Sequence, residues 1–155
     1  MYFCPVNINT GHFFSIQSEA EFNEAALEVF RFQAVNNTVY RDYISHLKVE
    51  VEGIKDYKNI PFLPISFFKS HAVISGNQPV AITFSSSGTT GQITSKHLVQ
   101  DLKIYEESYN KAFELCYGTA DDYCILALLP SYLERDGSSL IYMVDDLLKQ
   151  STHAK

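Results

Sequence analysis

A chain of 155 residues and 17.6 kDa, of which 46% are hydrophobic, is long enough to bury the core of about one domain. Its formal net charge of -6 and pI near 5.3 argue against a nucleic-acid surface, because none of its 12 Lys and Arg residues form a run. No window approaches the roughly 20 apolar residues of a membrane span, and the first residues lack the pattern of a signal peptide, so we expect a cytoplasmic protein.

The three cysteines are Cys4, Cys116 and Cys124. They are odd in number and share no metal-ligand spacing, so the sequence suggests neither a disulfide framework nor a metal site. We expect reduced thiols inside the core, and no residue is assigned to a metal.

Helix signals dominate the first third of the chain. Ser18 and Glu21 form a capping box, and the apolar spacing that follows predicts a helix from about Glu19 to Gln33. Its apolar stripe consists of Phe22, Ala26, Val29 and Phe30. The pair Asn36–Asn37 ends this helix and can cap a second one, whose stripe is Tyr40, Tyr43, Ile44 and Leu47. We expect both stripes to pack in the core rather than to form a ligand platform.

The next segment lacks helical periodicity. Over residues 49–64 the apolar pattern breaks, and the prolines of Ile60–Pro64 exclude a regular helix or a central strand, which indicates an ordered connector. Residues 66–71 predict one helical turn and residues 72–75 a short strand. β-branched and aromatic residues at 80–84 then predict a buried strand.

Hydroxyl side chains and glycines fill the loop that follows, residues 85–91. Such a loop suits a phosphate, because Gly88 and Gly91 permit unusual backbone conformations and let a ligand approach the main chain. The hydroxyl donors are Ser86, Ser87, Thr89 and Thr90. The P-loop of nucleoside triphosphatases is excluded, because that motif passes directly into a helix, whereas alternation over residues 93–99 predicts a strand.

Three further elements are predicted after these strands. Asp101 begins and Gly118 ends a helix. Tyr123–Leu129 is continuously apolar, as expected of a strand covered on both faces. A last helix follows, with Ser138 or Ser139 as its cap. This order favours an α/β layer architecture that stops just after a crossover helix, so we expect the chain to be the N-terminal piece of a longer protein.

The segment Ser86–Gly91 resembles the phosphate-loop signature of the adenylate-forming ligases, the superfamily of acyl-CoA synthetases, luciferases and peptide-synthetase adenylation domains. Ile60–Lys69 is similar to LuxE-type acyl-protein synthetases and more loosely to phenylacetate-CoA ligases. The likeness covers about Tyr57 to Met143. It implies that residues 1–155 are the N-terminal portion of an acyl-protein synthetase or adenylation domain, with an α/β fold in which helices pack on a mixed β-sheet.

The resemblance also implies a reaction. A carboxylic acid, a fatty acid by the LuxE likeness, attacks the α-phosphate of Mg-ATP to give an acyl-adenylate and pyrophosphate, and the acyl group then passes to a thiol of CoA or of a protein. The residues implied to bind the β- and γ-phosphates are Ser86, Ser87, Gly88, Thr89, Thr90 and Gly91. Backbone N–H groups, hydroxyls, Mg²⁺ and a lysine stabilise the charge that develops.

Lys96 is the candidate catalytic residue by this resemblance. The family's loop usually continues Gly-x-Pro-Lys, whereas here no proline follows Gly91 and the lysine stands two positions later. On a strand, Lys96 points either toward the phosphates or out to solvent, and His97 faces the opposite side. The sequence leaves both orientations of Lys96 open.

Ser138 is the candidate substrate-binding residue, because by resemblance the polar loop before it lies near the acyl pocket; a plain helix cap is the other interpretation. The sequence lacks the family's adenine-binding segment, ribose-binding aspartate and C-terminal lysine, so we expect that this chain alone does not complete catalysis. The alternative hypothesis is a non-catalytic nucleotide- or phosphate-binding module, or a loop that is only a polar turn. The acyl chain and the thiol acceptor stay open.

Overall fold

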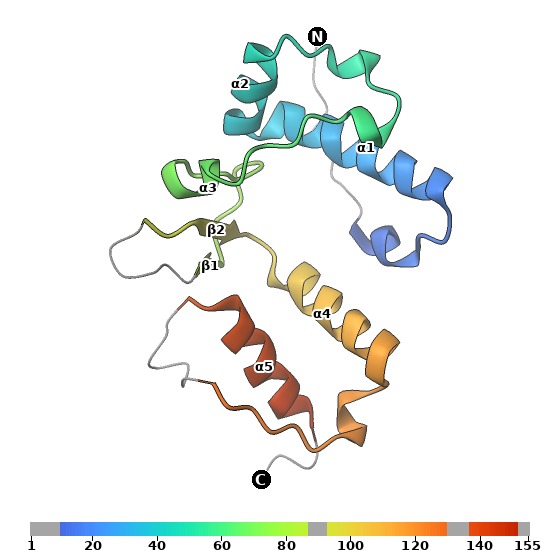
Figure 1. Cartoon of the computed structure of the whole chain (residues 1–155), viewed down its shortest axis with the longest axis vertical. Helices are drawn as coiled ribbons and strands as arrows, with labels where there is room; N and C mark the ends of the chain where they lie inside the picture. Colours follow the sequence, from blue (N-terminus) through green and yellow to red (C-terminus); the bar gives the residue numbers. More distant parts are fainter. Residues whose placement is uncertain (1–9, 87–92, 130–136, 152–155) are drawn as a thin grey trace. The chain divides into compact units, whose positions relative to one another are not determined.

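The computed structural model describes residues 10–86, 93–129 and 137–151 (Figure 1). Within them the chain is mostly helical, with five α-helices and one sheet of two antiparallel strands. The chain divides into two compact units, Met1–Gln78 and Pro79–Lys155, and each has its own cluster of buried apolar side chains. We call them the N-terminal unit and the C-terminal unit. The α/β composition is confirmed, whereas the described sheet is antiparallel rather than mixed.

Helix α1 (Glu19–Asn36) begins at the predicted cap. The hydroxyl oxygen of Ser18 accepts a hydrogen bond from the backbone N–H of Glu21 at 3.2 Å. The Glu21 carboxylate in turn accepts from the backbone N–H of Gln17 at 2.8 Å, one residue before the position that a capping box uses. These bonds satisfy backbone N–H groups that a helix start leaves without partners, and α1 runs three residues beyond the predicted end at Gln33.

Asn37 joins α1 to helix α2 (Thr38–His46), as predicted for this helix boundary. Its side-chain oxygen accepts from the backbone N–H of Tyr40 at 3.0 Å, and its amide donates to the Ser75 hydroxyl at 3.3 Å. Asn37 is only 4% exposed, so both bonds compensate the burial of a polar group. The buried core of the N-terminal unit consists of Phe30, Ala34, Tyr40 and Ile44.

The predicted apolar stripes lie only partly in this core. Phe30 is 2% exposed, but Phe22 is 48% exposed and Leu47 is 51% exposed. Helix α1 contacts both α2 and the connector, and its buried positions include Ala25 and Leu27, which lie outside the predicted stripe. The prediction that both stripes belong to the core is therefore wrong for Phe22 and Leu47.

Residues 47–66 form the predicted ordered connector. Two short 3-10 turns, η2 (Val51–Gly53) and η3 (Tyr57–Asn59), interrupt it. The single helical turn α3 (Phe67–Ser70) follows where the sequence predicts one.

The short strand predicted for residues 72–75 is not present. Strand formation requires a neighbouring backbone, and the only paired strands in the described ranges are elsewhere in the chain. Instead Ser75 is bonded to Asn37, and the next residue, Gly76, donates its N–H to the carbonyl of Asn36 at 2.8 Å. These side-chain and loop bonds hold the segment against the start of α2.

Strands β1 (Ile82–Ser85) and β2 (Lys96–Val99) confirm the two strands predicted on either side of the hydroxyl-rich loop. They pair antiparallel. Beyond the strand ends, the backbone N–H of Ser86 donates to the carbonyl of Ser95 at 3.0 Å, which extends the pairing by one step. The loop is therefore carried by a β-hairpin.

Helix α4 (Leu102–Tyr117) has both predicted ends. The Asp101 carboxylate accepts from the backbone N–H of Lys103 at 3.0 Å. At the other end Gly118 has φ 87°, a conformation that glycine adopts without steric cost, and its N–H donates to the carbonyl of Glu114 at 3.0 Å.

Helix α5 (Ser139–Gln150) packs with α4 in the core of the C-terminal unit. The rings of Phe84, Tyr105, Tyr109 and Tyr142 form one aromatic cluster that joins β1, α4 and α5. The Tyr109 hydroxyl donates to the Asp146 carboxylate. Burial raises the pKa of Tyr109, and the nearby charge of Asp146 raises it further.

The strand predicted for Tyr123–Leu129 is absent. Leu126 is 90% exposed and Leu128 is 103% exposed, so this stretch is not covered on both faces by the described residues. A strand requires a partner, and none of the described strands pairs with it. Cys124 in this stretch and Cys116 are also exposed, which corrects the expectation that they lie in the core.

Candidate functional site

Of the predicted phosphate loop, Ser86–Gly91, the structure describes Ser86, which lies opposite Ser95 of the returning segment. Besides the backbone bond between them, the N–H of Ser95 donates to the hydroxyl oxygen of Ser86 at 3.0 Å. Ser95 is 6% exposed, whereas Ser86 is exposed. A hydroxyl that accepts one bond keeps its own proton for donation, so Ser86 can close the hairpin and also donate to a phosphate. The remaining loop residues, Ser87, Gly88, Thr89, Thr90 and Gly91, lie outside the described residues.

The segment before α5 lies along the second edge of β1. The backbone N–H of Ser85 donates to the carbonyl of Gly137 at 2.8 Å. Gly137 has φ 78°, and a Cβ atom there would stand 3.4 Å from the carbonyl oxygen of Thr83. Glycine therefore permits both the turn and the close approach to the strand. Ser86 and Ser138, each next to one member of this bond, are brought to the same end of the hairpin.

Ser138 is the N-cap of α5. Its hydroxyl oxygen accepts from the backbone N–H of Ile141 at 3.4 Å. This contact is the one expected from the plain-cap interpretation. A role of Ser138 in substrate binding stays a prediction.

Lys96 and His97 lie on opposite faces of the hairpin, as strand alternation predicts. Lys96 is exposed and stands opposite Ser85, whereas His97 is partly buried and stands opposite Phe84. Phe84 is 5% exposed and packs against the rings of α4 and α5, so the His97 face is the one that the helices cover. The Nε2 atom of His97 is 3.4 Å from the Ser95 hydroxyl oxygen. Lys96 is therefore on the uncovered face of the hairpin.

Metal ligands are not grouped in the part of the chain that the structure describes. No three His, Cys, Asp or Glu side chains lie together there in a way that could hold an ion. In nucleotide sites Mg²⁺ is bound largely through phosphates and water, with only one or two carboxylates. The contribution of the hairpin to such a site would be donors to the phosphates.

The N-terminal unit contains a cavity that the sequence did not predict. Its volume is about 660 Å³, within the range of small-molecule sites. Its apolar wall is built from α1, α2 and the connector, and includes Phe22, Ala26, Val29, Phe30, Phe62 and Leu63. The complete predicted stripe of α1 thus lines this cavity. The sequence shows the apolar stripe, but it does not show how deeply each stripe residue is buried. The cavity could therefore not be predicted from it.

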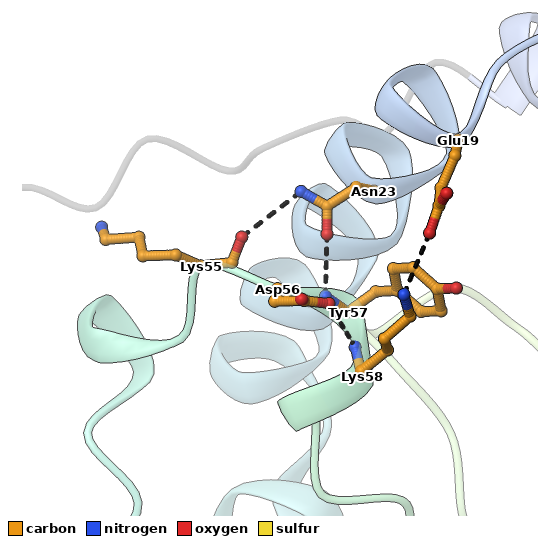
Figure 2. Close-up of polar contacts among 6 residues, drawn as sticks. All are labelled: Glu19, Asn23, Lys55, Asp56, Tyr57 and Lys58. Carbon is orange, nitrogen blue, oxygen red and sulfur yellow. Dashed lines mark hydrogen bonds and ion pairs between the residues drawn. The ribbon is translucent and has the colours of Figure 1, made fainter.

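Polar contacts hold the connector wall of the cavity to α1 (Figure 2). The Asn23 amide donates to the carbonyl of Lys55 at 3.3 Å, and its side-chain oxygen accepts from the backbone N–H of Tyr57 at 2.8 Å. The Lys58 ammonium lies 3.0 Å from the Glu19 carboxylate, and this bond raises the pKa of Lys58. The side chain of Asn23, within α1, thus binds the backbone of the connector and fixes its position.

Tyr40 provides a second attachment point for the connector. Its hydroxyl donates to the carbonyl of Pro61 at 2.7 Å, and the residue is 5% exposed. Burial raises the pKa of Tyr40 to about 12, with a further contribution from Tyr43. The connector is therefore attached to α1 at one point and to α2 at another.

Comparisons with protein-family models, with curated proteins and with solved structures find no match for this chain. No α-helix in the described ranges has the length and apolar character needed to cross a membrane.

Proposed function

We propose that this chain supplies the phosphate-binding loop for the ATP-dependent activation of a carboxylic acid to an acyl-adenylate. The observation that carries the proposal is the hairpin, whose end at Ser85 and Ser86 lies beside the Gly137–Ser138 turn. These are the two segments that the family resemblance implies for the phosphates and for the acid. The bond between Ser85 and Gly137 supports this proposal, because two substrates react only when they are held close together.

The described residues fit a nucleotide phosphate. Ser86 offers an exposed hydroxyl whose own proton is available, at the point where the backbone leaves the hairpin. Bound Mg-ATP would supply the electrophilic phosphorus and a pyrophosphate leaving group. The role of the loop would be to hold the phosphates and to stabilise their charge by preorganised donors. Lys96 would contribute a positive charge if its flexible stem reaches around the hairpin end.

The acid is proposed to be a fatty acid, and the acceptor a thiol of CoA or of a protein, as in acyl-protein synthetases. Ser138 would lie near the acid. The loop residues 130–136 that precede it are outside the described residues. Cys116 and Cys124 are exposed, but neither corresponds to the late cysteine that accepts the acyl group in LuxE-type proteins.

A non-catalytic phosphate- or nucleotide-binding module is the second candidate. It is favoured by two observations: the hydroxyl of Ser138 already caps α5, and Lys96 lies on the exposed face away from His97. The hairpin can bind a phosphate in either case. The two candidates differ in whether an acid reacts with it.

Two measurements on the same protein distinguish these candidates. The first is calorimetric titration with Mg-ATP; the second is the exchange of labelled pyrophosphate into ATP in the presence of hexadecanoate, using the product of the complete reading frame. A ligase should show acid-dependent exchange, whereas a binding module should bind Mg-ATP without exchange. If the protein does neither, the phosphate-loop assignment is wrong.

A pair of variants tests whether binding or exchange depends on the loop. Gly88→Val places a branched side chain where the phosphates would approach, so binding or exchange should fall by about 10²-fold. Gly53→Val is the matched control, because a Cβ at Gly53 meets only the Cβ of Glu50 at an ordinary 3.7 Å. Equal activity in the two variants would contradict the role of the loop.

A further inference from the structure

We propose that the cavity of the N-terminal unit binds an amphiphile, with its aliphatic tail between α1 and the connector and a cationic head group beside Glu21, Glu24 and Glu28. We call these three glutamates the acidic shelf. The proposal rests on the N-terminal unit alone and is independent of the function proposed for the hairpin. It assigns a ligand class to a site that the hairpin chemistry does not use.

The wall of the cavity matches an aliphatic tail. None of the residues that line it in the described chain is charged, and most are aromatic or aliphatic. Phe22 and Phe62 line it while remaining 48% and 76% exposed. Large exposed rings around a hollow are apolar surface that an occupant would remove from water, and this burial is the main favourable contribution to binding.

The cavity is preformed because hydrogen bonds fix the positions of its walls relative to one another. Asn23 fixes the connector at Tyr57, and Tyr40 fixes it again at Pro61. Asn37 holds Ser75 and with it the segment that carries Val73, another lining residue. Collapse of the cavity would require breaking bonds of buried polar groups, which is unfavourable. A preformed site loses less free energy to ordering when a ligand binds.

The head group is indicated by the charge at one end of the cavity. A second hollow of about 390 Å³ shares Ile16 and Ala25 with the apolar cavity, and its wall contains the acidic shelf. Among the described residues of this wall, His12 is the one basic side chain, and it lies 3.6 Å from Glu28. Glu21 already accepts a backbone bond from Gln17, while the Glu24 carboxylate forms no hydrogen bond or ion pair with another described residue.

Three carboxylates against a single histidine produce a negative potential at this end. A cationic head would be attracted, and a carboxylate head would be repelled. The two hollows adjoin at Ile16 and Ala25, so an amphiphile that occupies both would place its head group at the shelf. The site should therefore select long-chain amines over fatty acids of the same length.

The test uses three competitors with one tail. Dodecylamine, dodecanol and dodecanoate, each below its micelle concentration, are titrated at neutral pH and low salt against protein loaded with the neutral fluorescent probe phenylnaphthylamine. We expect dodecylamine to displace the probe at about a tenfold lower concentration than dodecanoate, with dodecanol between them. Added salt should reduce this difference. No displacement, or equal displacement by dodecanoate, would overturn the proposal.

Two variant pairs separate the cavity from adsorption to the acidic surface. Ala26→Phe fills the cavity and should weaken all three ligands by more than about tenfold, whereas Val35→Phe adds the same ring at a residue that is 46% exposed and outside the cavity wall. Circular dichroism establishes that both variants fold, and Ala26→Ile replaces Ala26→Phe if the larger ring prevents folding. Unchanged binding in the filled variant would show that the amphiphiles bind elsewhere.

Glu24→Gln tests the head group. It should reduce the preference for dodecylamine about threefold and leave dodecanol unchanged. Glu52→Gln removes the same charge from an exposed position outside the shelf and should leave the preference as it was. If both variants change the preference equally, net charge rather than the shelf attracts the amine. None of these results depends on ATP, so failure here leaves the hairpin proposal standing.

Discussion

The two units differ in how completely they cover their own apolar residues. In the N-terminal unit, Phe30 and Ile44 are 2% and 3% exposed, and polar bonds fix the connector to both helices. In the C-terminal unit, the aromatic cluster is packed, but Leu126 and Leu128 are 90% and 103% exposed. Large apolar side chains are exposed in both units, but Leu126 and Leu128 of the C-terminal unit are more exposed than Phe22 or Phe62 of the N-terminal unit.

This difference reflects the elements involved. The backbone groups of a helix form hydrogen bonds with one another. Two helices and a connector bonded to them can therefore form a core without other elements. A continuously apolar stretch such as Tyr123–Leu129 needs neighbours on its edges and on both faces. The described part of the C-terminal unit pairs β1 with β2, whereas it packs against this stretch at Tyr123 and Ile125 and pairs no strand with it.

The largest effect is expected in the core of the N-terminal unit. Phe30→Ala should lower the free energy of unfolding by about 3–5 kcal/mol, because it leaves a cavity where a ring was 2% exposed. Phe62→Ala, at 76% exposure, is the matched control and should cost about 0.5 kcal/mol. Urea denaturation followed by circular dichroism measures both. Similar losses would mean that the two positions are equally covered, contrary to the structure.

Alkaline pH should lower the free energy of unfolding of this unit, because Tyr40 loses a proton when the chain unfolds. Its pKa is raised to about 12 in the folded protein, so between pH 10.0 and pH 12 the unfolded chain loses a proton that the folded chain keeps. Stability from this group is complete below pH 10.0 and falls as pH rises, by roughly 1.4 kcal/mol per pH unit.

Tyr40→Phe provides the control for the alkaline effect. The variant lacks the titrating hydroxyl, so its stability should depend less steeply on pH over that range. Urea denaturation at a series of pH values measures the slope. Because Tyr109 of the C-terminal unit also has a raised pKa, part of the slope should remain. An identical slope in the variant would exclude Tyr40 as a source.

In the C-terminal unit, the cap of α5 should contribute less to the free energy of unfolding than Phe30 does in the N-terminal unit. Ser138→Ala removes the bond to Ile141 and should destabilise the protein by about 1 kcal/mol, while Ser138→Asp, another good cap, should retain most of the stability. Thermal denaturation gives both values. If Ser138→Asp is stable but loses acid-dependent pyrophosphate exchange, Ser138 also acts in substrate binding.

The smallest effect is expected at the uncovered stretch. Leu126→Ser and Leu128→Ser should each change the free energy of unfolding by no more than about 0.5 kcal/mol, since both side chains are already in solvent. Leu147→Ser, at 6% exposure, is the buried comparison and should cost several-fold more. Large losses at Leu126 and Leu128 would instead mean that this stretch is covered, as the sequence predicted, and the contrast between the units would disappear.

Most of the helix ends were predictable from the sequence. Ser18, Asn37, Asp101 and Ser138 each accept the capping bond that their position indicates. Capping depends on atoms three or fewer residues apart, so the local sequence contains the information. The alternation around Lys96 and His97 was predictable for the same reason.

The strands at residues 72–75 and 123–129 were predicted wrongly because apolar and β-branched content indicates only that a strand is possible. Pairing depends on a second segment, and the sequence of the first does not contain it. The candidate site was predicted in its residue types but not in its assembly. The Gly137–Ser85 bond joins residues 52 positions apart, and no local rule connects them.

The sequence by itself determined where most of the helices begin, that a hydroxyl-rich loop joins two strands, and that Lys96 and His97 face opposite ways. These properties follow from interactions between near neighbours in the chain. Only the tertiary structure decided that the Phe22 stripe lines a cavity, that Asn23 and Tyr40 bind the connector to α1 and α2, and that the Gly137–Ser138 turn lies along the edge of β1. Burial and cavity shape depend on which distant segments pack together, and many packings are compatible with one pattern of apolar residues.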